Sequence, residues 1–425
     1  MKNLIFANER GLVQWNSIDD SYEVLIASEL HASQGTIESL SASTNGQRFL
    51  VGWRQRPVEG NEATLVDIGN GTITPLDFPD LTYLPRDLSI SPDGSWAAYI
   101  NPCSSPSTPQ STVILMSHRP RPALGGCGAG VIYTVRVETP DQPIEIGYCR
   151  EERTEGSWRR CMGYLWSPDS QSILWSDAAG VWRAKVGQEP RLLAPYTIGV
   201  SPYQTASTVD LRAWSPSGQY VLVGIGHPLG WNWGIINADS GQVFEFPNWI
   251  VGSRWGPSVT WLADDRIFAV LPGDIQDETP PYGQIWSINS SKDSFVLERE
   301  FEIDVSPENY PTAPTQLGEN LLGFVILNID EENHRDRGVY FVELPNWMPQ
   351  KVNALPVNVQ HSGYTPSEID KFGFRVQIHW SPQGDVVIYE DNYLETRLLV
   401  PTDHGPPVAL KYYFGDWSCC YVWPK

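Results

Sequence analysis

Tryptophan and arginine gather in segments whose composition is typical of long loops. The chain has 18 tryptophans, and several of them lie within a few residues of an arginine. Aromatic and guanidinium side chains anchor protein interfaces because they bury a large area at a small entropic cost, and indole rings also suit stacking on sugars. The alternative for each tryptophan is that it packs under its own loop and stabilises it. The candidate partner-binding residues are Trp158, Arg159, Trp231, Trp233, Trp249, Arg254 and Trp255.

The sequence lacks the motifs of the common catalytic sites. It has no G-x-S-x-G nucleophile elbow, no phosphate-binding P-loop and no dinucleotide-binding glycine fingerprint. Its histidines are scattered without an H-x-x-x-H or H-E-x-x-H pair, so their spacing predicts no metal site. His379, on a predicted inner strand, is the histidine to watch at a central axis, although such a residue is more often structural. We therefore assign no catalytic residue, no metal ligand and no cofactor.

Two acidic segments have the residue types that calcium prefers, because calcium takes several oxygen ligands. They are Asp274–Glu278 and Asp330–Asp336. Neither matches the twelve-residue EF-hand loop, so the interpretation we favour is solvated surface charge.

The charge balance argues against nucleic acid as a partner. The chain has 29 basic and 50 acidic residues, a formal net charge of −21. Such a surface repels phosphate backbones, and its simplest role is solubility. No segment is long and apolar enough to predict a membrane span.

The cysteines and the N-terminus point to different compartments. Residues 1–10 contain too short an apolar run for a signal peptide, which favours a cytoplasmic protein if this is the native start. Four clustered cysteines could instead form two disulfides in an oxidising, extracytoplasmic compartment, with free buried thiols as the alternative. A structural zinc site is not predicted, because no C-x-x-C pair is present. The four are Cys103, Cys127, Cys149 and Cys161, and two more, Cys419 and Cys420, are adjacent near the C-terminus.

One short pattern recurs along the chain and must position these residues. It reads as a strand, a Ser-Pro-Asp-Gly-like turn and a second strand. Proline presets one turn dihedral, aspartate caps the turn, and glycine allows positive φ. Clear copies are centred on Ser91, Ser167, Ser215 and Ser381; degenerate copies begin at Ala42 and Trp261, and a poor one lies near Thr315.

The spacing of these copies predicts an all-β propeller. Several neighbouring copies are roughly 45 residues apart, which is the size of one four-stranded propeller blade. Counting every copy gives a single β-propeller with eight four-stranded blades. Seven blades is the alternative if the poor match near Thr315 is not a separate blade.

The two ends of the chain are expected to complete one blade together. Residues 4–28 resemble the second, third and fourth strands of a blade, and residues 417–425 resemble a first strand. Joining them removes two exposed sheet edges. Residues 1–425 are therefore predicted to form one domain, with residues 101–160 as an irregular, cysteine-containing insertion.

The Ser-Pro-Asp-Gly turns preceded by Trp or Ile resemble the TolB-like, WD40-like propeller repeat, often called PD40. The resemblance covers nearly the whole chain, although the Gly-His and Trp-Asp signatures of true WD40 repeats are absent. It implies a bacterial protein-binding scaffold, a periplasmic envelope component or the propeller half of a prolyl-oligopeptidase-like enzyme. A branch similar to oligogalacturonate lyases holds a metal through histidines.

The longest connections are expected on one face of the disc, opposite the Ser-Pro-Asp-Gly turns. Long loops inside a compact domain usually carry function. The predicted function is therefore a non-enzymatic binding or assembly scaffold that holds a protein or polysaccharide partner on this face. The alternative is a polysaccharide lyase or hydrolase whose catalytic groups gather at the central channel.

Overall fold

The computed structural model describes most of the chain. The described residues are 3–8, 11–16, 21–27, 36–54, 63–76, 86–102, 130–150, 152–154, 157–159, 161, 163–195, 208–227, 230–246, 258–263, 265–274, 277–289, 294–328, 334–355, 376–381, 383–391, 396–403, 405, 407–409 and 421–422.

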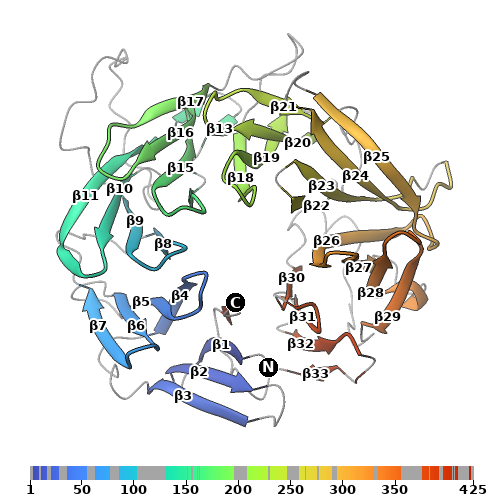
Figure 1. Ribbon diagram of the computed structural model, residues 1–425, viewed down its shortest axis with the longest axis horizontal. Coiled ribbons are helices and arrows are strands. Elements are labelled where there is room, and N and C mark those ends of the chain that lie inside the picture. Colours follow the sequence, from blue (N-terminus) through green and yellow to red (C-terminus); the bar gives the residue numbers. More distant parts are fainter. Residues whose placement is uncertain are drawn as a thin grey trace.

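Eight four-stranded antiparallel sheets surround a central axis as the blades of a propeller (Figure 1). Blade 1 is formed by β34 (Tyr421–Val422), β1 (Asn3–Asn8), β2 (Gly11–Asn16) and β3 (Ser21–Ala27); blade 2 by β4 (Thr36–Ala42), β5 (Arg48–Arg54), β6 (Ala63–Asp67) and β7 (Thr72–Leu76); blade 3 by β8 (Arg86–Ile90), β9 (Trp96–Pro102), β10 (Gly130–Arg136) and β11 (Thr139–Cys149); and blade 4 by β14 (Tyr164–Trp166), β15 (Ser172–Asp177), β16 (Gly180–Lys185) and β17 (Arg191–Pro195).

The other four blades follow the same order from the axis outward. Blade 5 is formed by β18 (Thr208–Trp214), β19 (Tyr220–His227), β20 (Gly230–Asn237) and β21 (Val243–Glu245); blade 6 by β22 (Ser258–Ala263), β23 (Arg266–Leu271), β24 (Tyr282–Asn289) and β25 (Ser294–Glu302); blade 7 by β26 (Asn309–Gly318), β27 (Leu321–Asn328), β28 (Gly338–Glu343) and β29 (Pro349–Ala354); and blade 8 by β30 (Val376–Trp380), β31 (Val386–Asp391), β32 (Thr396–Pro401) and β33 (Val408–Ala409).

The predicted blade count and the predicted closure are both confirmed. The weak repeat near Thr315 is the inner strand β26 of a complete blade, so the propeller has eight blades. In blade 1, β34 pairs antiparallel with β1, with Val422 opposite Ile5 and Tyr421 opposite Phe6. The two ends of the chain therefore meet in one sheet and close the ring.

A serine hydroxyl organises the turn between the first and second strands of a blade. In blade 4 the buried Ser167 accepts a hydrogen bond from the Ser172 amide at 2.9 Å, and its own hydroxyl donates to Asp169. Since the hydroxyl satisfies a backbone donor that water cannot reach, this serine explains the repeat signature. The same serine-to-amide bond recurs at Ser43, Ser91, Ser215 and Ser381.

Replacing Ser167 with alanine should lower the free energy of unfolding by about 1–3 kcal/mol, because the buried Ser172 amide loses its acceptor. The matched control is Ser217→Ala, at an exposed position of the corresponding turn in blade 5, which should change stability by less than about 0.5 kcal/mol. Urea unfolding followed by tryptophan fluorescence measures both. Equal effects of the two substitutions would contradict the role assigned to the hydroxyl.

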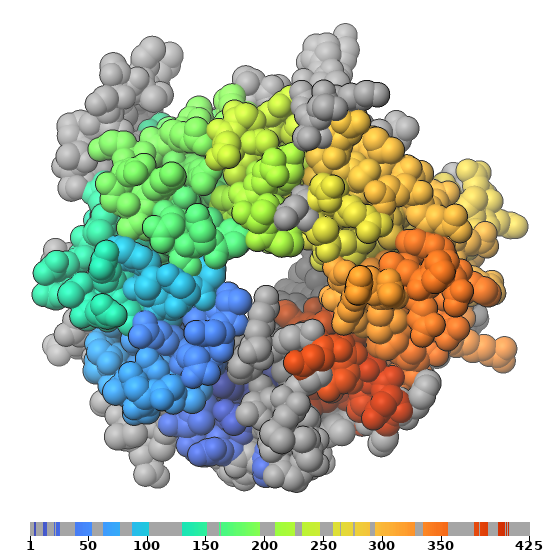
Figure 2. Space-filling model, in the orientation of Figure 1, coloured from blue at the N-terminus to red at the C-terminus, as the bar shows by residue number. Residues whose placement is uncertain are grey.

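The hydrophobic core is a ring of interfaces between neighbouring blades. Between blades 5 and 6, Leu222 and Ile235 pack with Ile267, Ala269 and Trp286. Equivalent clusters lie between the other blades, for example between blades 3 and 4 and between blades 7 and 8. Because the apolar faces are used between blades, the centre of the disc is not filled by core side chains, and Figure 2 shows an opening there.

The segment 101–160, predicted to be an irregular insertion, contains regular structure. Strands β10 and β11 supply the two outer strands of blade 3. Beyond them lies an additional two-stranded hairpin of β12 (Glu152–Thr154) and β13 (Ser157–Arg159). The segment therefore includes half of a blade as well as a projection from it.

Candidate functional site

The order of the strands places two kinds of connection on opposite faces of the disc. In each blade the chain runs outward from the axis, so first-to-second and third-to-fourth turns share one face, the turn face. Second-to-third connections and the links between blades share the other, which we call the long-loop face. The segments between β9 and β10, between β21 and β22, and between β29 and β30 belong to the long-loop face.

Four of the predicted partner-binding residues lie in strands rather than loops. Trp158 and Arg159 are in β13, and Trp231 and Trp233 are in β20. The segment 226–234, predicted to be a long connection, is instead formed by the ends of β19 and β20, which His227 and Gly230 close as a hairpin. The remaining three candidates, Trp249, Arg254 and Trp255, lie outside the described residues.

A disulfide anchors the hairpin that carries Trp158 and Arg159. Cys149 is the last residue of β11, and it bonds to Cys161 just before the inner strand of blade 4. The two cysteines are 0% and 3% exposed and pack in the core cluster between blades 3 and 4. The β12–β13 hairpin therefore leaves the body of the protein and returns to it at one covalently closed, buried point. Cys103, Cys127, Cys419 and Cys420 lie outside the described residues.

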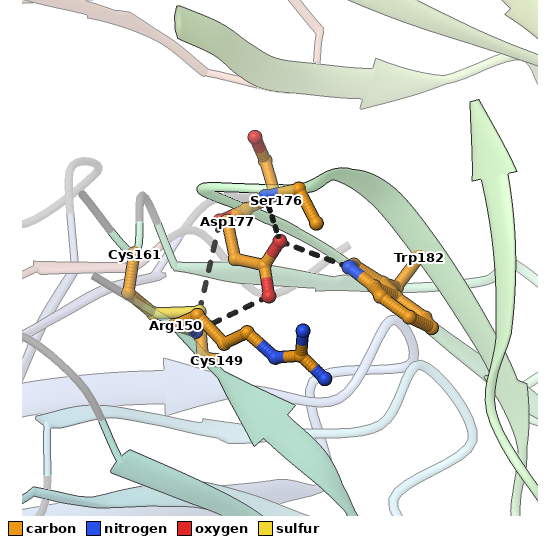
Figure 3. Close-up of a disulfide and its surroundings, with 7 residues drawn as sticks. Cys149, Arg150, Cys161, Ser176, Asp177 and Trp182 are labelled. Carbon is orange, nitrogen blue, oxygen red and sulfur yellow. Dashed lines mark hydrogen bonds between the residues drawn. A yellow bond between two sulfur atoms is a disulfide. The ribbon is translucent and has the colours of Figure 1, made fainter. Parts of the chain in front are cut away.

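A buried aspartate adds a second anchor beside the disulfide. Asp177, at the end of β15, is 0% exposed. Its carboxylate accepts hydrogen bonds from the Arg150 amide at 3.2 Å, the Ala179 amide at 2.8 Å and Trp182 Nε1 at 2.9 Å, contacts that surround the disulfide in Figure 3. The Ala178 amide in turn donates to the Arg150 carbonyl at 3.3 Å. The residue that follows Cys149 is thus bound to the β15–β16 turn of the next blade.

The electrostatics of Asp177 are those of a structural group. Burial raises the pKa of its carboxyl, and the amide and indole donors partly offset that shift. The Arg150 guanidinium lies 5.7 Å from the centre of the Trp182 ring, a cation–π contact on the same joint. With its donors supplied by backbone amides and an indole, this carboxylate holds two blades and the root of the hairpin together.

On blade 5, Trp233 belongs to a charged and aromatic array that sequence reasoning missed in part. The Arg212 guanidinium lies 5.7 Å from the centre of the Trp233 ring and pairs with Asp210 at 2.5 Å. Across the blade, Asp210 of β18, Gly224 of β19 and Trp233 of β20 lie side by side in register. Because Gly224 has no side chain, the arginine of the inner strand can reach the tryptophan of the third strand.

This array has the composition of an interface anchor. The Arg212 side chain is 50% exposed, whereas Asp210 is 18% exposed and Trp233 is half-buried against the cluster between blades 5 and 6. Burial raises the pKa of Asp210, and the charge of Arg212 lowers it. The sequence signal that could have found Arg212 is the pair of glycines, Gly224 and Gly226, inside an otherwise apolar strand.

Residues that could support metal chemistry do not converge in the described part of the protein. No group of three or more His, Cys, Asp or Glu side chains there could hold a metal ion. His379 lies half-buried in the inner strand β30, opposite Ile388. Among the described residues, no helix has the length and apolar character needed to cross a membrane.

The chain matches no protein-family model and no curated protein sequence. Its likeness to known proteins lies in three-dimensional structure. A eukaryotic initiation factor aligns with 100% of this chain and 98% of its own length, at 10% identity and a TM-score of 0.52.

Two further similar structures have different activities. The dihydro-heme d1 dehydrogenase NirN aligns with 99% of this chain and 74% of its own, at 11% identity and a TM-score of 0.49. TolB from Acinetobacter baumannii aligns with 72% of this chain and 64% of its own, at 13% identity and a TM-score of 0.36. At these identities the likeness shows a propeller fold and does not select between enzymes and non-enzymes.

Proposed function

We propose that the protein is a non-enzymatic binding scaffold whose long-loop face holds a protein or polysaccharide partner. The observation that carries this proposal is the anchored β12–β13 hairpin. Its root is fixed by the Cys149–Cys161 disulfide and by the hydrogen bonds of Asp177. A projection with a fixed root loses little entropy on binding, and its second strand carries Trp158 and Arg159.

A quantitative binding comparison tests the proposal. The wild-type protein and a Trp158→Ala/Arg159→Ala variant serve as baits for proteins of the source organism and as probes on a glycan array. The binding that the wild type shows should weaken about tenfold or more in the variant, as expected when an aromatic and arginine anchor is removed. Met348→Ala is the control, because Met348 is 70% exposed in the β28–β29 turn on the turn face.

Two outcomes of this comparison would count against the proposal. One is retention of the same partners, with the same affinity, by the hairpin variant. The other is turnover of a glycan by the wild type, which would favour the alternative of a polysaccharide lyase or hydrolase acting at the central channel. Equal melting temperatures of the three proteins ensure that a loss of binding is not a loss of folding.

We also propose an extracytoplasmic location. Disulfides persist in oxidising compartments and are rare in reducing ones, and the buried Cys149–Cys161 bond is part of the core between blades 3 and 4. The cytoplasmic alternative requires both thiols to be free in the cell. Rapid alkylation of source cells, followed by mass spectrometry of the two cysteine-containing peptides, distinguishes the two locations.

A further inference from the structure

A buried arginine in blade 7 has no described carboxylate as its partner. Arg337 lies between the short 3-10 helix η2 (His334–Asp336) and β28, and it is 7% exposed. Its Nε atom is buried and has no hydrogen-bond acceptor, and the guanidinium makes no ion pair with any described residue. A buried charge without a counter-charge costs several kcal/mol, so a compensating group is expected at this position.

Another buried arginine of this protein shows what compensation looks like. The Arg183 side chain is 12% exposed, and its Nη1 atom pairs with Asp239 at 3.0 Å. The same nitrogen donates to the Ala238 carbonyl at 2.7 Å, and the guanidinium lies over the Trp214 ring. Arg337 is more deeply buried and has none of these contacts among the described residues.

The carboxylate next to Arg337 in the chain is already engaged elsewhere. Asp336 Oδ2 accepts hydrogen bonds from the Ser306 amide at 3.2 Å and from Asn309 Nδ2 at 3.0 Å. These contacts bind η2 to the connection between blades 6 and 7. Asp336 therefore serves that connection and makes no ion pair with Arg337.

The surroundings of η2 carry further positive charge. The Lys351 ammonium of β29 donates to the Arg335 carbonyl at 2.5 Å. The lysine stem crosses Gly338, where an added Cβ would meet Lys351 Cε at 2.6 Å. Burial lowers the pKa of Lys351, and the charge of Asp336 raises it. In a protein of net charge −21, this end of blade 7 is locally basic.

The alternation of β28 indicates where Arg337 lies. Val339, two residues further along, packs with Leu327, Leu355 and Tyr389 in the cluster between blades 7 and 8. Residues two apart in an extended chain share one side, so Arg337 is at the long-loop end of this same interface. A planar guanidinium there presents parallel N–H donors, which match the oxygens of a carboxylate or a phosphate.

We propose that Arg337 is the recognition group of an oxyanion-binding site at the long-loop end of the interface between blades 7 and 8. The ligand is a carboxylate or a phosphate, and the Arg337 guanidinium binds it through two parallel hydrogen bonds. The site does not depend on the hairpin or on Trp233, so it is separate from the proposed partner-binding residues.

Thermal unfolding in matched salts tests the site. The melting temperature of the wild-type protein is measured in sodium phosphate and in sodium acetate, each against sodium chloride of equal ionic strength. We expect a saturable rise of about 1–2 °C at a tenfold excess over the dissociation constant. A rise in phosphate alone identifies a phosphate site, a rise in acetate alone identifies a carboxylate site, and no saturable rise in either overturns the proposal.

Three variants separate the site from general salt effects. Arg337→Met should abolish the anion response, and its melting temperature in chloride should equal or exceed that of the wild type. Arg337→Lys keeps the charge without the planar fork and should weaken anion binding about tenfold. Arg335→Met, at an exposed neighbouring position, should leave the response intact.

Two results with the methionine variant would overturn the proposal. The first is an anion response equal to that of the wild type, which would place the binding elsewhere. The second is a marked fall in melting temperature in chloride, which would show that a carboxylate of the protein itself compensates Arg337.

Discussion

Replacing Asp177 with alanine should lower the free energy of unfolding by about 3 kcal/mol or more. The substitution leaves the Arg150 amide, the Ala179 amide and the Trp182 indole N–H without their acceptor. Each buried donor that loses its partner costs about 1–3 kcal/mol. Relief of the buried charge offsets part of this cost, so the net loss is smaller than the sum of the three. Chemical denaturation monitored by circular dichroism measures the change.

The pH dependence of the Asp177→Asn variant separates charge from hydrogen bonding. Burial raises the folded-state pKa of Asp177 above the ordinary value of 3.8. The contribution of this group to stability is then fully present below that ordinary value and is lost as the pH rises through the folded-state pKa. The stability difference should therefore move in favour of the asparagine variant as pH rises through this window. A difference that moves in favour of the wild type would contradict the assigned shift.

Removal of the disulfide should cost about 3 kcal/mol and should loosen the hairpin first. Cys149 and Cys161 are separated by 12 residues, and closing a loop of this size restricts the unfolded chain by roughly that amount. In Cys149→Ala/Cys161→Ala, the root of the β12–β13 hairpin depends on the Asp177 hydrogen bonds alone. We expect partner binding to weaken together with stability.

Limited proteolysis locates the effect of the disulfide. Arg153 and Arg159 lie in the two strands of the hairpin, and trypsin cleaves after arginine. Cleavage at these residues should be faster in the double alanine variant than in the wild type under native conditions. The control is cleavage after Arg191 in β17, which should keep its rate. Equal acceleration at both places would mean that the disulfide stabilises the propeller as a whole and has no specific effect on the hairpin.

The propeller itself could be predicted because its information is local and repeated. The turns at Ser91, Ser167, Ser215 and Ser381 each contain their own buried hydroxyl and its amide donor five residues later. A contact that spans five residues is legible in a linear pattern. Closure by β1 and β34 was also predictable, because each end of the chain is an incomplete blade that complements the other.

The site residues were harder to predict because their partners lie on different strands or blades. Arg212 reaches Trp233 only because Gly224 lies between them in register, and no spacing along the chain encodes that contact. Trp231 and Trp233 read as loop residues, because the glycines around them suggest a turn that the β19–β20 hairpin does not make there.

The sequence by itself determined the fold class, the eight blades and the shared terminal blade. Only the tertiary structure decided that Cys149 pairs with Cys161, that Asp177 binds the neighbouring chain segment, and that Arg337 is buried. The physical reason is range. Turn chemistry acts within a few residues and repeats with each blade, whereas pairing and burial depend on which blades become neighbours when the ring closes.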